Sequence, residues 1–170
     1  DILIYKRTGT GPWDLQDTLS ISRLAHCITI DGDYFAFTHS EWPPGSAVVN
    51  SIYIYKTTDS GANWSLEATI AHPGTAGSYF GNIMLANSPS SGTDQVLTVG
   101  SYGSTDLYRT YVYNSTTASS TWTLNQVLSA GNDGSIAVAI TDDQNYLIES
   151  LGYDDTNETN AGGANIYPRN

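Results

Sequence analysis

Positive charge is scarce in this sequence. Six residues are Lys or Arg, whereas seventeen are Asp or Glu, so the formal net charge is −11. A field of this sign repels the phosphate groups of nucleic acids and of anionic membranes. We therefore expect no nucleic-acid partner.

Cysteine is scarce as well. Cys27 is the single cysteine of the chain, which excludes an intrachain disulfide. It lies in the apolar run of residues 25–30, where we expect a buried, inert thiol. The adjacent His26 is not expected to activate it, because consecutive residues of a strand point to opposite faces.

Long apolar runs and helical periodicity are also missing. No segment approaches the roughly 20 apolar residues of a membrane-spanning helix, so we expect no membrane insertion. No segment longer than about ten residues has a clean helical spacing of apolar residues. The second of these absences favours an all-β fold.

What the chain does contain is a repeated pair of strands. The pattern is an aliphatic residue followed by Tyr, then Trp eight or nine residues later, then Leu two residues after the Trp. It occurs in residues 4–19, 54–70 and 112–128, with Tyr5 and Trp13, Tyr55 and Trp64, and Tyr113 and Trp122. A further tyrosine is Tyr167, and successive tyrosines are 50, 58 and 54 residues apart, which is the length of a propeller blade. We expect the three tryptophans to pack between adjacent units.

A second strand pair lies between copies of the first. Residues 28–37, 83–101 and 138–150 each read as strand, polar turn and strand, with apolar residues at alternate positions. Asp31-Gly32 is a strong turn signal of this kind. Each repeat unit therefore combines both pairs and has four strands.

The strand count predicts one repeat domain that is incomplete at both ends. Residues 1–19 give a strand pair that could complete another blade, 20–70 and 71–128 each give a full blade, and 129–170 give three strands. We expect a β-propeller-like array of four-stranded antiparallel blades, about three per chain. Closed propellers have about four to eight blades, so this chain is too short to close a usual ring alone.

With both patterns in place, the chain resembles the FG-GAP repeat, the blade of integrin-alpha-type propellers. The resemblance rests on "VYNSTTASSTWTLNQVLSA" (112–130), "GTAGSYFGNI" (74–83) and "DDQNYLIESLG" (142–152), where Phe80-Gly81 matches the Phe-Gly pair of that family. The pair occurs in the middle unit alone, and the acidic calcium loop of the family is not recognisable. The turns at 31–33 and 142–145 are too short to supply about six to eight oxygen ligands, so we expect no cofactor and disfavour calcium.

Residues 57–64 resemble an Asp-box, T-x-D-x-G-x-x-W, which is found on the blades of sialidase-like propellers. The resemblance implies that Asp59 caps turn amides, that Gly61 adopts a positive φ and that Trp64 packs beneath the turn. In such propellers the box is a fold element away from the active centre. We therefore expect a turn and not a site.

Catalytic chemistry is not expected. A sialidase-like mechanism would need three converging arginines, but the four arginines fall at unrelated repeat positions, and the histidines lack metal-ligand spacing. No nucleophile elbow, P-loop or dinucleotide fingerprint occurs. Glu149 is the one candidate for an inward-pointing catalytic carboxylate. We expect no enzyme, no catalytic residue and no metal site.

Three glycosylation sequons begin at Asn63, Asn114 and Asn157. We expect the first two in corresponding hairpin turns of successive units and the third in a loop, where a glycan acceptor must lie. Trp42 stands outside the repeat pattern, in a loop sequence, and is a candidate for contact with a ligand.

Three functions stay open from sequence. The first is an extracellular, glycosylated structural protein, at a cell or virion surface, whose partner is itself: the opening strand pair of one copy completes the last blade of the next, head to tail, and gives a ring or a filament. The second is an adhesin-like binding module that recognises a glycan or a surface protein through loops, Trp42 included. The third is a fragment of a longer propeller.

Overall fold

A computed structural model shows how the chain folds. It describes residues 1–21, 25–39, 50–74, 78–87, 94–103, 109–116, 121–129, 135–151 and 162–169. These residues form thirteen strands and no helix. The all-β fold class expected from the sequence is therefore confirmed.

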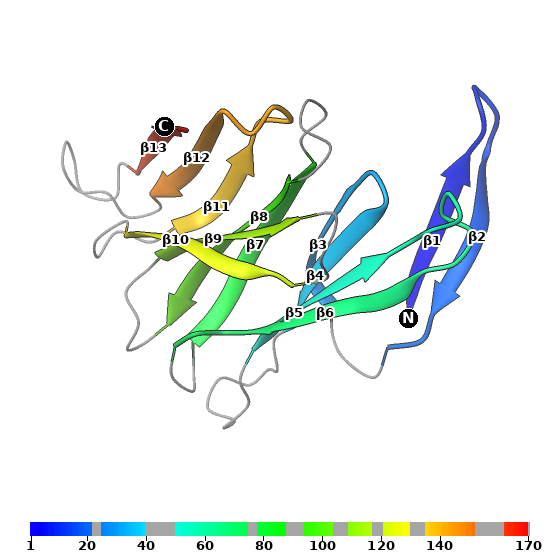
Figure 1. Ribbon diagram of the computed structural model, residues 1–170, viewed down its shortest axis with the longest axis horizontal. Helices are drawn as coiled ribbons and strands as arrows, with labels where there is room; N and C mark the ends of the chain where they lie inside the picture. Colours follow the sequence, from blue (N-terminus) through cyan, green and yellow to red (C-terminus); the bar gives the residue numbers. More distant parts are fainter. Residues whose placement is uncertain are drawn as a thin grey trace.

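The strands pair into four antiparallel sheets, which we call sheets A to D (Figure 1). Sheet A contains β1 (Ile2–Arg7) and β2 (Trp13–Leu19). Sheet B contains β3 (Ala25–Asp31), β4 (Tyr34–His39), β5 (Ser51–Lys56) and β6 (Ser65–Ala71). Sheet C contains β7 (Ser78–Asn87), β8 (Asp94–Gly103), β9 (Arg109–Thr116) and β10 (Thr123–Ser129). Sheet D contains β11 (Ser135–Ile140), β12 (Tyr146–Leu151) and β13 (Gly163–Pro168). The expected four-stranded antiparallel sheets are thus present, and each is a meander of consecutive strands.

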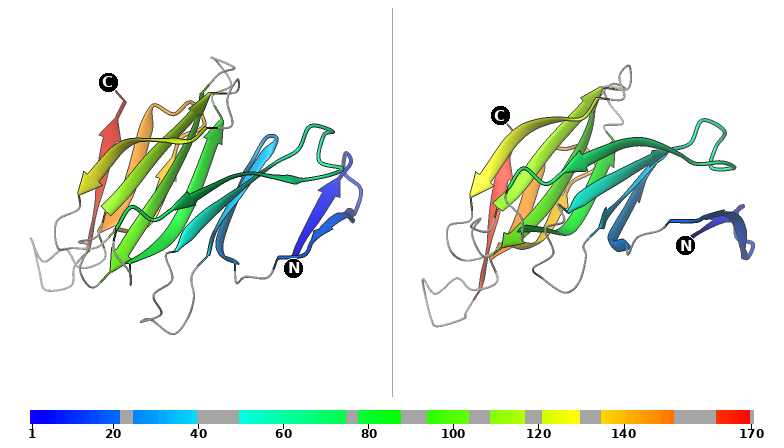
Figure 2. Two further views of the ribbon diagram at one scale, coloured as in Figure 1. Left: turned by 60° about the horizontal axis from the view of Figure 1, so that its bottom comes forward. Right: turned by 90° about the horizontal axis from the view of Figure 1, so that it is seen from below.

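The sheets follow one another face to face, from sheet A at one end to sheet D at the other (Figures 1 and 2). Strands β3 and β4 pack against β7, and β11 packs against β7 and β8. The N- and C-termini consequently lie at opposite ends of the stack. The described strands do not close into a ring or a barrel.

Three apolar cores join the successive sheets. The core between sheets A and B contains Ile2, Ile4 and Leu19 against Phe35, Phe37, Tyr53, Tyr55 and Trp64. The core between sheets B and C contains Tyr34, Ala36, Ile52 and Ile54 against Phe80, Ile83, Leu85, Leu97, Val99, Tyr111 and Tyr113. The core between sheets C and D contains Met84, Ala86, Val96, Val112 and Leu128 against Ile140, Leu147 and Tyr167. Each internal sheet is therefore apolar on both faces.

The alternation along β5 shows how one strand serves two cores. Ile52 and Ile54 point toward sheet C, whereas Tyr53 and Tyr55 point toward sheet A. The ring of Tyr55 stacks on Phe35 of the neighbouring strand, with centroids 4.9 Å apart. The aliphatic-Tyr pair of the repeat therefore places its two side chains in two different cores.

A break in strand pairing recurs at the same repeat position. In sheet A, Ile4 pairs with Asp17 and Tyr5 with Leu15, so the pairing skips Gln16. The corresponding residues Glu67 in sheet B and Asn125 in sheet C are skipped in the same way. A β-bulge of this kind bends the strand and increases its twist. The polar residue after each Trp-x-Leu is thus the extra residue of a bulge.

Candidate functional site

The Thr57–Trp64 turn satisfies its own polar groups. The hydroxyl of Thr57 donates to Asp59 Oδ1 at 2.8 Å and accepts from the Gly61 N–H at 2.9 Å. Asn63 donates its backbone N–H to Asp59 Oδ1 at 2.9 Å and its side-chain N–H to Asp59 Oδ2 at 2.6 Å. These bonds from Asn63, with that from Thr57, lower the pKa of Asp59 to about 2. Both carboxylate oxygens are therefore committed to the turn.

The backbone of this turn needs its glycine, and its tryptophan packs on the sheet. Gly61 has φ +90°, a conformation that favours glycine, and Ser60 has φ 58°. The Trp64 ring meets Phe35 edge to face, with centroids 5.0 Å apart. The turn thus holds β5 and β6 together and offers no free catalytic group.

The turn between β11 and β12, which was expected from the sequence, is closed by the same hydrogen bonds, which were not expected. Thr141 Oγ1 donates to Asp143 Oδ1 at 2.6 Å, and Asn145 donates its backbone and side-chain N–H groups to the two Asp143 oxygens at 3.0 and 2.8 Å. The pKa of Asp143 is lowered, first by the bond from Thr141. The Thr-x-Asp spacing with Asn following, which this turn shares with Thr57, Asp59 and Asn63, is the signal that could have identified these bonds.

Glu149 is fully buried between sheets C and D. Its carboxylate accepts hydrogen bonds from the hydroxyls of Thr110 and Tyr167, each at 2.6 Å, and from Asn165 Nδ2 at 3.1 Å. Burial, followed by the bond to Glu149, raises the pKa of Tyr167 to about 12. All three partners are neutral donors, and they tie β12 to β9 and β13. The arrangement anchors two sheets to each other.

The repeat tryptophans have unequal environments. Trp64 and Trp122 are half-buried and pack against the cores on either side of sheet B. Trp13 is 64% exposed, with Arg7 above its ring at 5.4 Å. The expectation that all three pack between units is therefore wrong for Trp13, because no described sheet lies on the outer side of sheet A.

Phe80 and Gly81 lie where sheet B meets sheet C. Phe80 is buried against His72, with ring centroids 4.5 Å apart, and the Gly81 carbonyl accepts a weak bond from Thr38 Oγ1 at 3.5 Å. The neighbouring Asn82 Oδ1 accepts from the Cys27 thiol at 3.2 Å. Burial raises the pKa of that thiol, which is consistent with an inert group.

The sequons differ in accessibility. Asn63 lies in the exposed turn between β5 and β6, as expected. Asn114 lies in β9 and is half-buried, so its expected place in a hairpin turn is wrong. The reason is that β9 continues past the Tyr-containing core segment to pair with Thr123. Asn157 and Trp42 lie outside the described residues.

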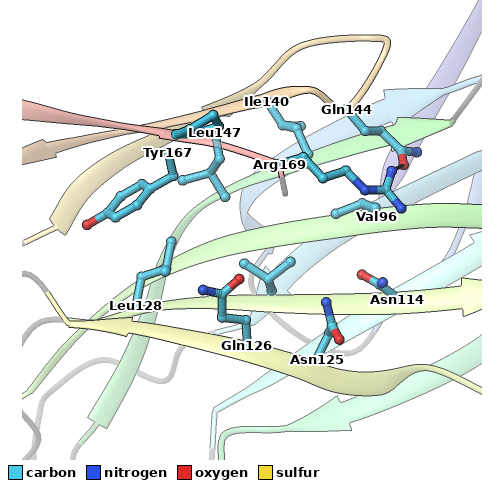
Figure 3. A pocket seen from close by; sticks show the side chains of 12 residues that line it. Val96, Asn114, Asn125, Gln126, Leu128, Ile140, Gln144, Leu147, Tyr167 and Arg169 are labelled. Carbon is cyan, nitrogen blue, oxygen red and sulfur yellow. Dashed lines mark hydrogen bonds between the residues drawn. The ribbon is translucent and has the colours of Figure 1, made fainter.

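A small pocket lies between sheets C and D (Figure 3). It has a volume of about 110 Å³, and the side chains of Asn114, Asn125 and Gln126 point from sheet C toward sheet D. From sheet D, Arg169 donates to Gln144 Oε1 at 3.0 Å above them. Sites for whole small ligands typically measure about 300–1,000 Å³, so this pocket fits a single side chain or one edge of a sugar.

Large apolar side chains are exposed at the two ends of the stack. On sheet A, the outward side chains are Leu3, Tyr5, Trp13 and Leu15, each about half exposed or more; we call them the A face. On sheet D, the outward side chains are Tyr146, Ile148 and Ile166; we call them the D face. Neither face is covered by any residue that the structure describes. These faces are the strongest candidates for a functional surface.

No group of three or more His, Cys, Asp or Glu residues is placed to hold a metal ion in the described part of the chain. The described residues also include no helix that could span a membrane. No protein-family model matches the chain, and no curated protein matches its sequence. The FG-GAP resemblance consequently stays a prediction.

Proposed function

We propose that this chain is an extracellular structural protein, built as part of a β-propeller-like array, that assembles head to tail with copies of itself. The observation that carries the proposal is the pair of uncovered apolar faces at opposite ends of one stack. Seven large apolar side chains, four on the A face and three on the D face, are exposed there. Contiguous exposed apolar surface of this kind marks sites of association.

The two faces suit each other as a continuation of the stack. Inside the chain, the face of sheet C that points away from sheet B packs on sheet D. Placing the D face of one copy on the A face of the next repeats that contact and removes both sets of side chains from water. Because the two surfaces differ, the contact is heterologous and forms a ring or a filament.

The edge contact expected from the sequence is a less favourable way to join two copies. Sheet D has three strands and sheet A has two, so joining their edges would give a sheet of five strands, whereas sheets B and C have four. Edge pairing alone would also leave the A and D faces in water. We therefore propose a face-to-face contact in place of blade completion by β2.

The test is sedimentation of the 170-residue chain over a wide concentration range, with electron microscopy of the largest species. Ile166→Lys places a charge in the D face and is expected to leave monomers, since a buried unpaired charge opposes the contact. Leu124→Lys is the matched control, because Leu124 is exposed on β10 of the internal sheet C. Equal association of both variants would contradict the proposal.

Glycosylation of the proposed extracellular protein is expected at Asn63, because that side chain is exposed in a turn. Mass spectrometry of protein from a secreting eukaryotic host should show a glycan that Asn63→Gln removes. Asn114→Gln should leave the mass of the attached glycan unchanged, since Asn114 is half-buried in β9.

A second candidate function is recognition of a glycan or a protein side chain, favoured by the amide groups and Arg169 around the pocket of Figure 3. Planar amides and a guanidinium present several directed hydrogen-bond donors and acceptors. A glycan array probed with the wild type and with Arg169→Ala tests it. Binding that survives Arg169→Ala would exclude this pocket as the site.

A further inference from the structure

Sheets B, C and D carry equivalent rows of side chains that face the preceding sheet. In sheet B, Ile30 pairs with Phe35, which pairs with Tyr55. In sheet C, the row is Leu85, Leu97 and Tyr113, and in sheet D it is Ile140, Leu147 and Tyr167. Because Tyr55, Tyr113 and Tyr167 are the repeat tyrosines, Ile30, Leu85 and Ile140 are equivalent positions on the first strand of each sheet.

These equivalent positions differ sharply in exposure. Leu85 is 2% exposed and Ile140 is 9% exposed, but Ile30 is 62% exposed. The next row repeats the difference, with Ile83 at 6% and Ile28 at 57%. The chemistry of the side chain is the same in all cases. What differs is whether the preceding sheet has strands in front of it.

In sheet C, the β3–β4 hairpin supplies that cover. The Leu85 N–H donates to Thr29 Oγ1 of β3 at 3.2 Å, and Tyr34 and Ala36 of β4 lie in the same core. In front of sheet B, sheet A contributes β1 and β2, which correspond to the third and fourth strands of a unit. Among the described residues, nothing occupies the place of the first two strands.

The position of the two absent strands is bordered by an exposed apolar surface of sheet B, the floor, and by an unpaired edge of β1. Ile28 and Ile30 form the floor. Beside Ile30, a cavity of about 330 Å³ opens toward β1, and it is lined by Ile4, Tyr5, Lys6, Ile30 and Trp64 together with residues of the β3–β4 and β5–β6 turns. The edge is the side of β1 that faces away from β2, where no described strand pairs with it. In sheets B and C, the equivalent strands β5 and β9 are paired on both sides. We call the floor and this edge the inner seat.

We propose that the inner seat binds an antiparallel β-hairpin, which covers Ile28 and Ile30 with its first strand and pairs with the free edge of β1 through its second. The proposal goes beyond the proposed function, which concerns the outer face of sheet A and not the side that faces sheet B. It extends the contact that β1 and β2 already make on sheet B. Main-chain bonds to β1 supply affinity, and side chains on alternate positions supply specificity.

The chemistry of the hairpin that would bind follows from the equivalent place on sheet C, which the β3–β4 hairpin covers. The residues of the β3–β4 hairpin that face sheet C are Cys27 and Thr29 of β3 and Tyr34 and Ala36 of β4. A matching hairpin has small or apolar residues where it covers Ile28 and Ile30, because a charge at that place would be buried against isoleucine. A charged peptide strand or a flexible polar chain does not meet this requirement.

The probe is a synthetic peptide with the sequence of residues 25–39, the β3–β4 hairpin itself. Ile28, Ile30, Phe35 and Phe37 of the peptide are replaced by Thr, because that face would point to solvent. Hydrogen exchange of the full 170-residue chain is measured with and without the peptide. Alternate amides of β1 are expected to exchange more slowly when the peptide is bound, and the amides of β13 are expected not to change.

Ile30→Asp in the 170-residue chain should weaken peptide binding by about tenfold or more, since it places a charge under the hairpin. The matched control is Val127→Asp, at an exposed position of β10 outside the seat, for which we expect affinity within about twofold of the wild type. Peptide binding that does not protect β1, or that survives Ile30→Asp, overturns the proposal.

Sedimentation of the same samples separates this proposal from the proposed function. Ile30 belongs to neither the A face nor the D face, so Ile30→Asp is expected to leave head-to-tail association intact. Association without protection of β1 by the peptide overturns the inner seat alone. Protection of β1 that Ile30→Asp abolishes, in a chain that stays monomeric, supports the seat and contradicts head-to-tail assembly.

Discussion

The contact between sheets B and C differs from the contact between sheets A and B in one respect. Leu85, on the first strand of sheet C, is covered by β3 and β4, whereas the equivalent Ile30 of sheet B faces a cavity. At the third strand of each sheet the two contacts are alike, since Tyr113 and Tyr55 both pack against the preceding sheet. An apolar residue at a core position of the repeat is therefore buried only if the neighbouring unit supplies its first two strands.

The largest effect on stability is expected on sheet C, where the β3–β4 hairpin covers Leu85. Leu85→Ala removes a side chain that is 2% exposed and leaves a cavity between sheets B and C. We expect the free energy of unfolding to fall by about 2–5 kcal/mol. Urea denaturation followed by tryptophan fluorescence measures the change. A loss under about 1 kcal/mol would show that the B–C contact is loosely packed.

The contact between sheets C and D is expected to depend on Glu149. Glu149→Ala removes the acceptor of the buried Thr110 hydroxyl and of the half-buried Tyr167 hydroxyl, and one of the two acceptors of the Asn165 amide. We expect a loss of about 2–4 kcal/mol of unfolding free energy, because the unsatisfied buried donor Thr110 costs about 1–3 kcal/mol and the half-buried Tyr167 costs less. Denaturation of Glu149→Gln is the control, since Gln keeps one acceptor oxygen and should cost less.

The pKa of Tyr167 distinguishes the effect of its hydrogen bond to Glu149 from the effect of burial. The pKa of Tyr167 is raised to about 12 by burial and then by its bond to Glu149. Removing the negative charge in Glu149→Gln should lower that pKa, as followed by NMR of labelled tyrosine. An unchanged pKa would assign the whole shift to burial.

The turn that borders the unfilled seat should give a pH-dependent effect of intermediate size. The pKa of Asp59 is about 2 in the fold, against about 3.9 for an ordinary aspartate. A lowered pKa stabilises the fold above about pH 4, and this contribution is lost as the pH falls through about 2. The stability difference between the wild type and Asp59→Ala should therefore shrink over that range. A difference that is independent of pH would contradict the hydrogen bonds from Asn63.

The smallest effect is expected where the seat is empty. Ile30→Ala changes a side chain that is 62% exposed, so we expect a loss of less than about 1 kcal/mol in the same denaturation experiment. The contrast with Leu85→Ala tests the equivalence of the two positions directly. A loss for Ile30→Ala as large as that for Leu85→Ala would mean that the seat is already covered in solution.

The alternation of apolar residues and the turn signals were sufficient to predict an all-β fold with four-stranded antiparallel sheets. Both signals are local, because the side chains of a strand alternate between its two faces whatever the strand packs against. Exposure depends on neighbours, and for this reason the prediction failed at Trp13, whose sequence pattern is the same as that of Trp64.

Other features of the candidate site were beyond the sequence for a related reason. Asn114 was wrongly assigned to a turn. Where a strand ends depends on its pairing with the next strand, and here Asn114 pairs with Thr123 of β10. Glu149 was considered as an inward-pointing catalytic candidate, but its partners Thr110 and Asn165 come from two other strands. Such long-range partners leave no mark in the spacing of one segment. The Thr-x-Asp turns, in contrast, are local and were within reach.

Mixing two end variants tests head-to-tail assembly most directly. Leu15→Lys blocks the A face and Ile166→Lys blocks the D face, and both positions are exposed, at 53% and 64%. Each variant alone should sediment as a monomer, and an equimolar mixture should form dimers and nothing larger, because one intact A face meets one intact D face. Dimers or larger species of either variant alone, or a mixture that stays monomeric, would contradict the account.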